Sequence, residues 1–112
     1  MLAKDIEKLR EILLASFQER GINAEKIVIF GSCVKDRKSR KDSDVDLVIV
    51  SKDFRNKDIF ERIELARGVH RKLVAEIMKP FDIMYYSDEE WKKRKSLIIN
   101  TAKNEGLSIH ER

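Results

Sequence analysis

The residue types best suited to chemistry lie in two short motifs, Gly31-Ser32 and the carboxylate pair Asp44 and Asp46. The Gly-Ser pair directly follows one apolar run, and the carboxylate pair leads directly into another. Side chains at positions i and i+2 of a strand point to the same face, so we expect the two carboxylates to converge. Such oxygen ligands suit Mg²⁺, which binds one or two carboxylates together with substrate phosphates.

The Gly31-Ser32 pair supplies a second kind of site. A tight turn after a strand can present backbone N–H groups to phosphate. We expect this turn to open toward the same end of the sheet as the carboxylate pair. A metal site beside a phosphate site indicates nucleotide chemistry.

Composition sets the class of protein. The chain of 112 residues is long enough for one domain, 1–112, with a modest core; 42% of residues are hydrophobic and 39% are charged. Its net charge of +4 is too small an excess to indicate nucleic-acid binding.

Cys33 is the single cysteine, so no intramolecular disulfide can form, and we expect a cytoplasmic protein without a signal peptide. No apolar stretch approaches the roughly 20 residues of a membrane span, so we expect no membrane association.

Apolar spacing predicts an alternation of helices and strands. Apolar residues three and four apart predict a first helix over residues 2–17, which Gly21 ends. Residues 26–30, 45–51 and 81–86 are rich in β-branched and aromatic side chains and predict strands. The order of elements is typical of an α/β domain.

Three further elements complete this prediction. A short helical turn is expected after Ser32, and a long helix over residues 59–78, with Asn56 as its cap and Gly68 as a point where it could break. Ser87 and Glu90 form a capping-box pattern that opens a last helix reaching about residue 104. Residues 107–110 could add a short edge strand.

The order strand, Gly-Ser, loop, Asp-x-Asp, strand resembles the minimal nucleotidyltransferases of the DNA polymerase β superfamily. These are small single-domain relatives of kanamycin nucleotidyltransferase, often encoded beside a HEPN-domain protein. The resemblance covers nearly the whole chain, including SDVDL at 43–47, Asp82 within FDIM at 81–84, and NEGLSI at 104–109. It implies one small α/β nucleotidyltransferase-type domain, with a mixed sheet of three to four strands and helices packed against it.

The resemblance also implies roles for individual residues. Gly31 and Ser32 match the pair that holds the β- and γ-phosphates of the nucleotide. Asp44 and Asp46 match the ligands of two Mg²⁺ ions, and Asp82 matches a third carboxylate that joins the second metal and helps to deprotonate the attacking hydroxyl. Two metals held together in this way can clamp both the attacking and the leaving oxygens of an in-line displacement. ATP is then the expected substrate.

The chain departs from the family after Gly31-Ser32. Many members continue with Arg, a small residue, Arg and Gly, whereas this chain has CVKD at 33–36. Loss of the first Arg removes a bidentate phosphate donor that Lys cannot fully replace, although Lys35 can supply charge to the phosphates. The substitution keeps the predicted site but leaves the extent of turnover open.

A basic loop separates the two motifs. Five of the seven residues from Lys35 to Lys41 are basic. They could hold the triphosphate, meet an acidic partner or an RNA backbone, or form a solvated connection, and the sequence does not decide among these. Aromatic residues do not interleave with the charges, which disfavours stacking on single strands. Cys33 is interpreted as a small buried residue, because no nucleophilic triad is readable around it.

These residues suggest Mg²⁺-dependent transfer of AMP from ATP to a hydroxyl, with release of pyrophosphate. The domain is small, so we expect a partner protein to supply the acceptor. By resemblance, that partner is a HEPN-domain toxin modified on a tyrosine, and this chain is its antitoxin. The alternative is a non-catalytic antitoxin that neutralises its partner by sequestration. A nucleic-acid-binding module that uses the basic loop is a third and less favoured interpretation.

Overall fold

A computed structural model of the chain describes residues 3–31 and 44–112. The expectations for Ser32, Cys33, Lys35 and the rest of the basic loop, including the short helical turn after Ser32, lie outside these residues. Among the described residues, no helix combines the length and the apolar character that crossing a membrane requires.

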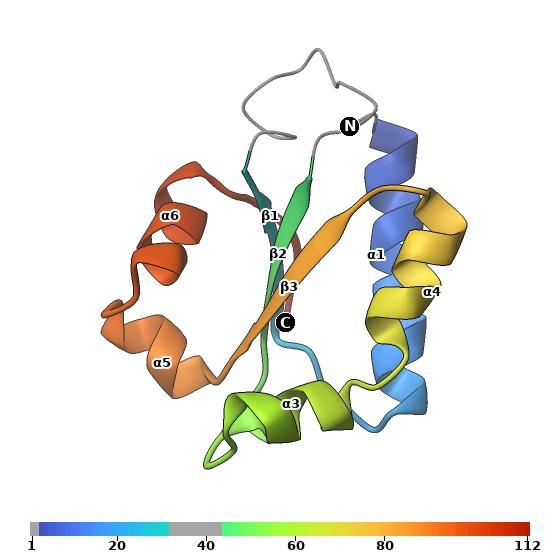
Figure 1. Cartoon of the computed structure of the whole chain (residues 1–112). Coiled ribbons are helices and arrows are strands. Elements are labelled where there is room, and N and C mark those ends of the chain that lie inside the picture. The colour runs from blue at the N-terminus through green and yellow to red at the C-terminus, as the bar shows by residue number, and fades with distance from the viewer. Residues whose placement is uncertain (1–2, 32–43) are drawn as a thin grey trace.

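A four-stranded mixed sheet forms the centre of the molecule (Figure 1). Its strands are β1 (Lys26–Phe30), β2 (Val45–Val50), β3 (Phe81–Tyr86) and β4 (Leu107–Glu111), in the spatial order β3-β2-β1-β4. β1 pairs antiparallel with both β2 and β4, whereas β2 pairs parallel with β3. This confirms the α/β class and the mixed sheet, including the short edge strand that was expected near the C-terminus.

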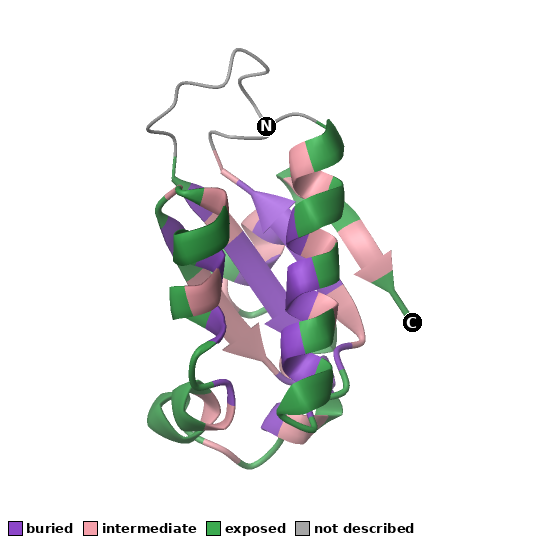
Figure 2. Cartoon of the chain, turned by 90° about the vertical axis from the view of Figure 1, so that its right-hand side faces the viewer, coloured by how far each residue is buried: buried purple, intermediate pink, exposed green. Residues whose placement is uncertain are grey.

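The two faces of the sheet are covered by different helices. α1 (Ala3–Glu19) and α4 (Val69–Ile77) lie on one side of the sheet, α5 (Asp88–Lys93) and α6 (Leu97–Glu105) lie on the other, and α3 (Ile59–Leu65) lies across one end (Figure 1). The buried residues form two clusters, the larger one against α1 and α4. In Figure 2 the residues coloured as buried lie along one side of α1 and in the strands behind it.

Strand β2 contributes to both clusters because its side chains alternate between the faces. Val45, Leu47 and Ile49 belong to the larger cluster, while Val48 and Val50 belong to the smaller one. A strand buried on both faces reads as a continuous apolar run, which is why the sequence predicted it so clearly.

The prediction of one long helix over residues 59–78 is wrong. The segment forms α3 and α4, which are separated at Gly68, where φ is +88°. A left-handed backbone conformation suits glycine and ends a helix, so the expected break does occur at this residue. The N-cap is Asp58 in a capping box with Glu61, and not Asn56.

The prediction of a single last helix is wrong in the same way. The capping box of Ser87 and Glu90 is confirmed and opens α5. Arg94 then adopts a left-handed conformation, with φ at +53°, and Ser96 caps the separate helix α6. The sequence 94–96 carries no Gly or Pro, so its propensities did not reveal the break.

We expect the larger cluster to provide most of the stability of the fold. Leu73 of α4 is fully buried, whereas Leu97 of α6 is 83% exposed. Leu73→Ala should lower the free energy of unfolding by about 2–5 kcal/mol through lost burial and the cavity it leaves. Leu97→Ala should change it by no more than about 0.5 kcal/mol. Urea denaturation of both variants tests this, and equal losses would contradict the assignment of the core.

Candidate active site

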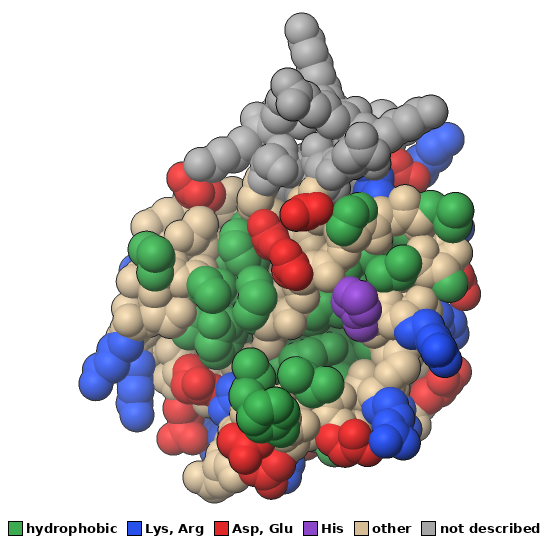
Figure 3. Space-filling model, in the orientation of Figure 1, with side chains coloured by type: hydrophobic (Ala, Val, Ile, Leu, Met, Phe, Trp, Pro, Cys, Tyr) green, Lys and Arg blue, Asp and Glu red, His purple; other side chains and the backbone are tan. Residues whose placement is uncertain are grey.

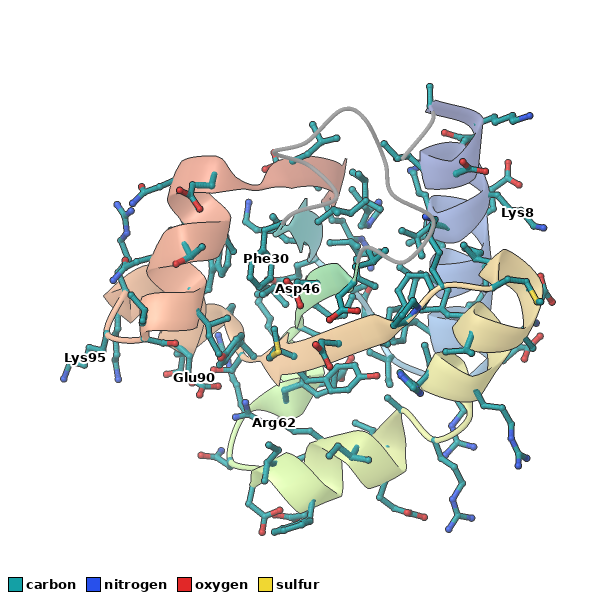
Figure 4. All side chains as sticks on the ribbon, turned by 45° about the horizontal axis from the view of Figure 1, so that its top comes forward. Lys8, Phe30, Asp46, Arg62, Glu90 and Lys95 are labelled. Atoms are coloured by element: carbon teal, nitrogen blue, oxygen red, sulfur yellow. The ribbon has the colours of Figure 1, made fainter. Side chains whose placement is uncertain are left out.

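Strand pairing brings the candidate residues to one end of the sheet. The antiparallel register places Phe30 opposite Asp46, so Gly31 follows directly beside that carboxylate. The parallel register places Asp82 opposite Asp46 on the other side. Figure 4 shows Phe30 and Asp46 close together where the strands meet. Gly31, Asp46 and Asp82 come from three separate segments and meet at one place.

Alternation along the strands also sets the face that these carboxylates share. Asp46 precedes Val48 on the face of β2 that packs in the smaller cluster. Asp82 precedes Met84 and Tyr86, which pack against the same cluster. The carboxylates therefore lie just beyond the end of an apolar layer, and acidic side chains gather at this end of the molecule (Figure 3).

Gly31 leaves the space that Asp46 occupies. Its φ is +94°, and a Cβ added there would collide with Oδ2 of Asp46. Any larger residue would meet both backbone strain and this clash. The glycine is thus required for the close approach of β1 to the carboxylate, which was not evident from the motif alone.

The electrostatics at Asp46 are those of a crowded acidic site. Partial burial raises the pKa of Asp46, and the neighbouring charges of Asp82 and Asp44 raise it further. A hydrogen bond with Asp82 acts in the same direction. Each of these effects disfavours the ionised form of Asp46. A cation placed here would relieve the repulsion between the carboxylates.

The structure brings some predicted residues together and leaves others apart. Asp46 and Asp82 form a direct pair, while the exposed Asp44 lies at the start of β2 and acts on Asp46 through its charge. Within 3–31 and 44–112, no three His, Cys, Asp or Glu side chains are grouped closely enough to form a metal site as they stand. The assignment of Asp44, Asp46 and Asp82 as metal ligands therefore stays a prediction.

The donor set nevertheless fits a hard divalent cation. The charge of Asp82 disfavours ionisation of Asp46, and partial burial raises the cost of the charge on Asp46 further. Mg²⁺ prefers carboxylate oxygens and retains several ligand positions for water and phosphate. A pair of carboxylates, with a third at the rim, is consistent with that preference.

The sequence analysis missed two side chains that hold the Asp82 strand. His70 lies within hydrogen-bond distance of the carbonyl oxygen of Phe81, with Nε2 at 2.8 Å, directly before Asp82. Arg62 donates from Nη1 to the carbonyl oxygen of Tyr85 at 2.8 Å and from Nε to that of Lys57 at 2.9 Å. Both side chains lie 11 to 23 residues from their partners on β3, so local sequence patterns carry no signal for these contacts.

Arg62 also connects α3 to α5. Its Nη2 lies 2.7 Å from Oε1 of Glu90 (Figure 4). Glu90 is also the residue that completes the capping box of α5 with Ser87. Nearby, Arg55 forms a two-pronged ion pair with the buried Asp88 and lowers the pKa of that carboxyl to about 2. These charged contacts fix the far end of β3 relative to α3 and α5.

Comparison with known families identifies the class of domain. Residues 6–106 match the nucleotidyltransferase domain, so the chain belongs to this family. This match includes every described candidate residue of the site. Among curated proteins, none matches the chain.

Two solved structures share the fold. The crystal structure of a toxin-antitoxin with AMP-PNP is similar at a TM-score of 0.62 and 17% identity, covering 91% of this chain and 73% of the other. A putative nucleotidyltransferase from Sulfolobus solfataricus is similar at a TM-score of 0.57 and 17% identity, covering 97% and 86%. At this identity the likenesses establish the fold and not the substrate.

Replacing Gly31 should damage the site more than its stability loss explains. Gly21 provides a matched control, because its φ is +71° and a Cβ there would meet nothing within 4 Å. Backbone strain should cost Gly31→Ala and Gly21→Ala about 1–2 kcal/mol each, and the collision with Asp46 should add to the loss in Gly31→Ala. Only Gly31→Ala should also weaken binding of ATP with Mg²⁺, measured by calorimetry. Unchanged binding in Gly31→Ala would show that the close approach to Asp46 is not needed.

Removing the charge of Asp46 should stabilise the protein when no divalent cation is present. The raised pKa means that the folded state binds more protons than the unfolded state, so Asp46 lowers stability as pH rises through the interval between its ordinary and its raised pKa. Asp46→Asn should therefore melt at a higher temperature than wild type at pH 7, with the difference closing near pH 3. Mg²⁺ should stabilise wild type more than the variant. Equal melting temperatures at both pH values would contradict the repulsion.

Proposed function

We propose that this chain is an Mg²⁺-dependent nucleotidyltransferase that moves AMP from ATP to a hydroxyl of a partner protein, releasing pyrophosphate. The observation that carries the proposal is the meeting of Gly31, Asp46 and Asp82 at one end of the sheet. Membership of the nucleotidyltransferase family supports the same reaction class.

Each candidate residue is assigned a part in this reaction. Asp44, Asp46 and Asp82 would hold Mg²⁺, which when bound neutralises charge on the phosphates and on the departing pyrophosphate. Gly31 allows the nucleotide-binding turn to approach Asp46. Asp82 accepts the proton of the acceptor hydroxyl, whose oxygen forms a bond to the α-phosphorus while the bond from that phosphorus to the bridging oxygen breaks. Ser32 and Lys35 are proposed to bind the β- and γ-phosphates.

The proposed acceptor is a HEPN-domain toxin, for which this chain serves as antitoxin. A similarly folded structure is that of a toxin-antitoxin with AMP-PNP. It contains both a toxin partner and a nucleotide analogue, and the proposal requires a toxin and a nucleotide. The sequence resemblance further suggests a tyrosine as the modified residue.

Intact-mass spectrometry tests the proposal directly. The chain, ATP and Mg²⁺ are incubated with the protein encoded beside it. The partner should gain the mass of one or more AMP groups, and a variant with Asp44→Ala and Asp46→Ala should add none. If the partner's mass is unchanged but a stable complex forms, sequestration is the better account. Protection of cells by the double variant would support the same conclusion.

Asp82 provides the sharpest test of the proposed chemistry. Asp82→Asn should retain ATP binding while AMP transfer falls by about 10²- to 10⁴-fold, the usual contribution of a positioned general base. Glu76→Gln, which removes an exposed carboxylate from α4, should leave both unchanged. Quenched-flow or gel assays of AMP transfer give the rates. Wild-type transfer by Asp82→Asn would remove the assigned role of Asp82.

A further inference from the structure

Helix α3 presents apolar side chains that the chain itself does not cover. None of its residues is buried, and three of its large apolar side chains are mostly exposed: Ile59 is 66% exposed, Phe60 78% and Ile63 52%. Large apolar side chains gathered on one short helix are typical of an interaction surface. Together with Ile83 and Tyr85 of the edge strand, they define what we call the α3–β3 surface.

Two depressions on this surface join into one groove. A cavity of about 470 Å³ is lined by Ile63, Ile83, Tyr85 and, at its end, Asp82 and His70. A second cavity of about 340 Å³ shares the same three apolar residues and continues past them to residue 86. The floor of the groove is hydrophobic, and acidic side chains lie directly above it in the view of Figure 3. The groove therefore follows β3 and opens at the proposed catalytic carboxylate.

The backbone of β3 restricts what can occupy this groove. β3 is an edge strand, which would ordinarily invite an added strand. Its outward carbonyl groups at Phe81 and Tyr85 are already engaged by His70 and Arg62. An added strand would have to displace both side chains, so recognition here depends on side-chain packing.

The charges around the groove restrict the occupant further. Arg62 is paired with Glu90 at 2.7 Å, and Arg67 with Glu64 at 3.0 Å. Two further carboxylates at the start of α3 are engaged in its capping box. Because these charges are largely paired and of both signs, the surface does not suit a phosphate backbone. An apolar protein surface can cover it without leaving these charges unpaired.

We propose that the α3–β3 surface docks an amphipathic helix of the acceptor protein and so delivers its hydroxyl to Asp82. This inference rests on the proposed function. The groove runs from Asp82 to Tyr86, four residue steps of about 3.3 Å, or roughly 13 Å. About nine residues of helix span that length, and ridges such as Ile59 and Ile63, four residues apart, pack between the side chains of a partner helix.

Binding measurements with the protein encoded beside this chain test the proposal. Ile63→Glu and Ile59→Glu place a charge on exposed positions that line the groove, so the fold should persist, and each should weaken the complex at least about tenfold. Leu97→Glu is the matched control, since Leu97 is 83% exposed on α6, across the sheet. It should leave the affinity unchanged. ATP binding without the partner shows whether the carboxylate site is intact in each variant.

The outcomes separate this inference from the proposed function. Normal affinity in both α3 variants, or a loss confined to Leu97→Glu, would overturn the docking site while AMP transfer could persist. Affinity that depends on Ile63 without any AMP transfer would retain the docking site and reject the reaction. Absence of a wild-type complex would overturn both.

Two further measurements distinguish the occupants. Hydrogen exchange on the partner should show protection within a helix, and protection of an extended segment would overturn the helical assignment. Sedimentation of this chain alone should show a monomer. A dimer that Ile63→Glu dissociates would instead make the surface a contact between two copies.

Discussion

The central position of β2 determines where every described chemical group lies. Because β1 runs antiparallel to β2, the end of β1 meets the start of β2. Because β3 runs parallel to β2, the two strands start together. Gly31, Asp46 and Asp82 are consequently adjacent, and reversal of either neighbour would carry its residue to the opposite end of the sheet.

This arrangement places like charges together at the end of a hydrophobic strand. Burial and the charges of Asp82 and Asp44 both disfavour the ionised form of Asp46. The residues that follow in β2 are almost completely buried, and they hold the strand in place despite that repulsion. The fold thus keeps an electrostatically unfavourable site in a fixed geometry, which is the condition a cation-binding site requires.

The edge strand β3 serves two purposes through different sets of atoms. The side chain of Asp82 shares a face with Asp46, whereas outward carbonyl groups of the strand are held by Arg62 and His70 from the flanking helices. These contacts protect the edge from an added strand while α3 keeps apolar side chains exposed beside it. A protein partner could then approach the carboxylates without remodelling the sheet.

Much of this protein was determined by local sequence. The apolar runs predicted β1, β2 and β3 almost to the residue. For β1 and β2 the reason is that a strand buried on both faces reads as a nearly continuous apolar run. The capping pattern at Ser87 marked the start of α5 for an equally local reason. The types and spacing of the acidic residues indicated a cation site before any pairing was known.

Other features were decided only by the tertiary structure. The helix break at Arg94 carried no local signal, whereas the break at Gly68 fell at a residue that the sequence had already marked. The contacts of Arg62 and His70 with β3 join residues distant in sequence, and the exposure of α3 depends on what the rest of the chain leaves uncovered. Local patterns report which residues prefer a helix or a strand. Strand order and register decide which of them meet, because those depend on packing across the whole chain.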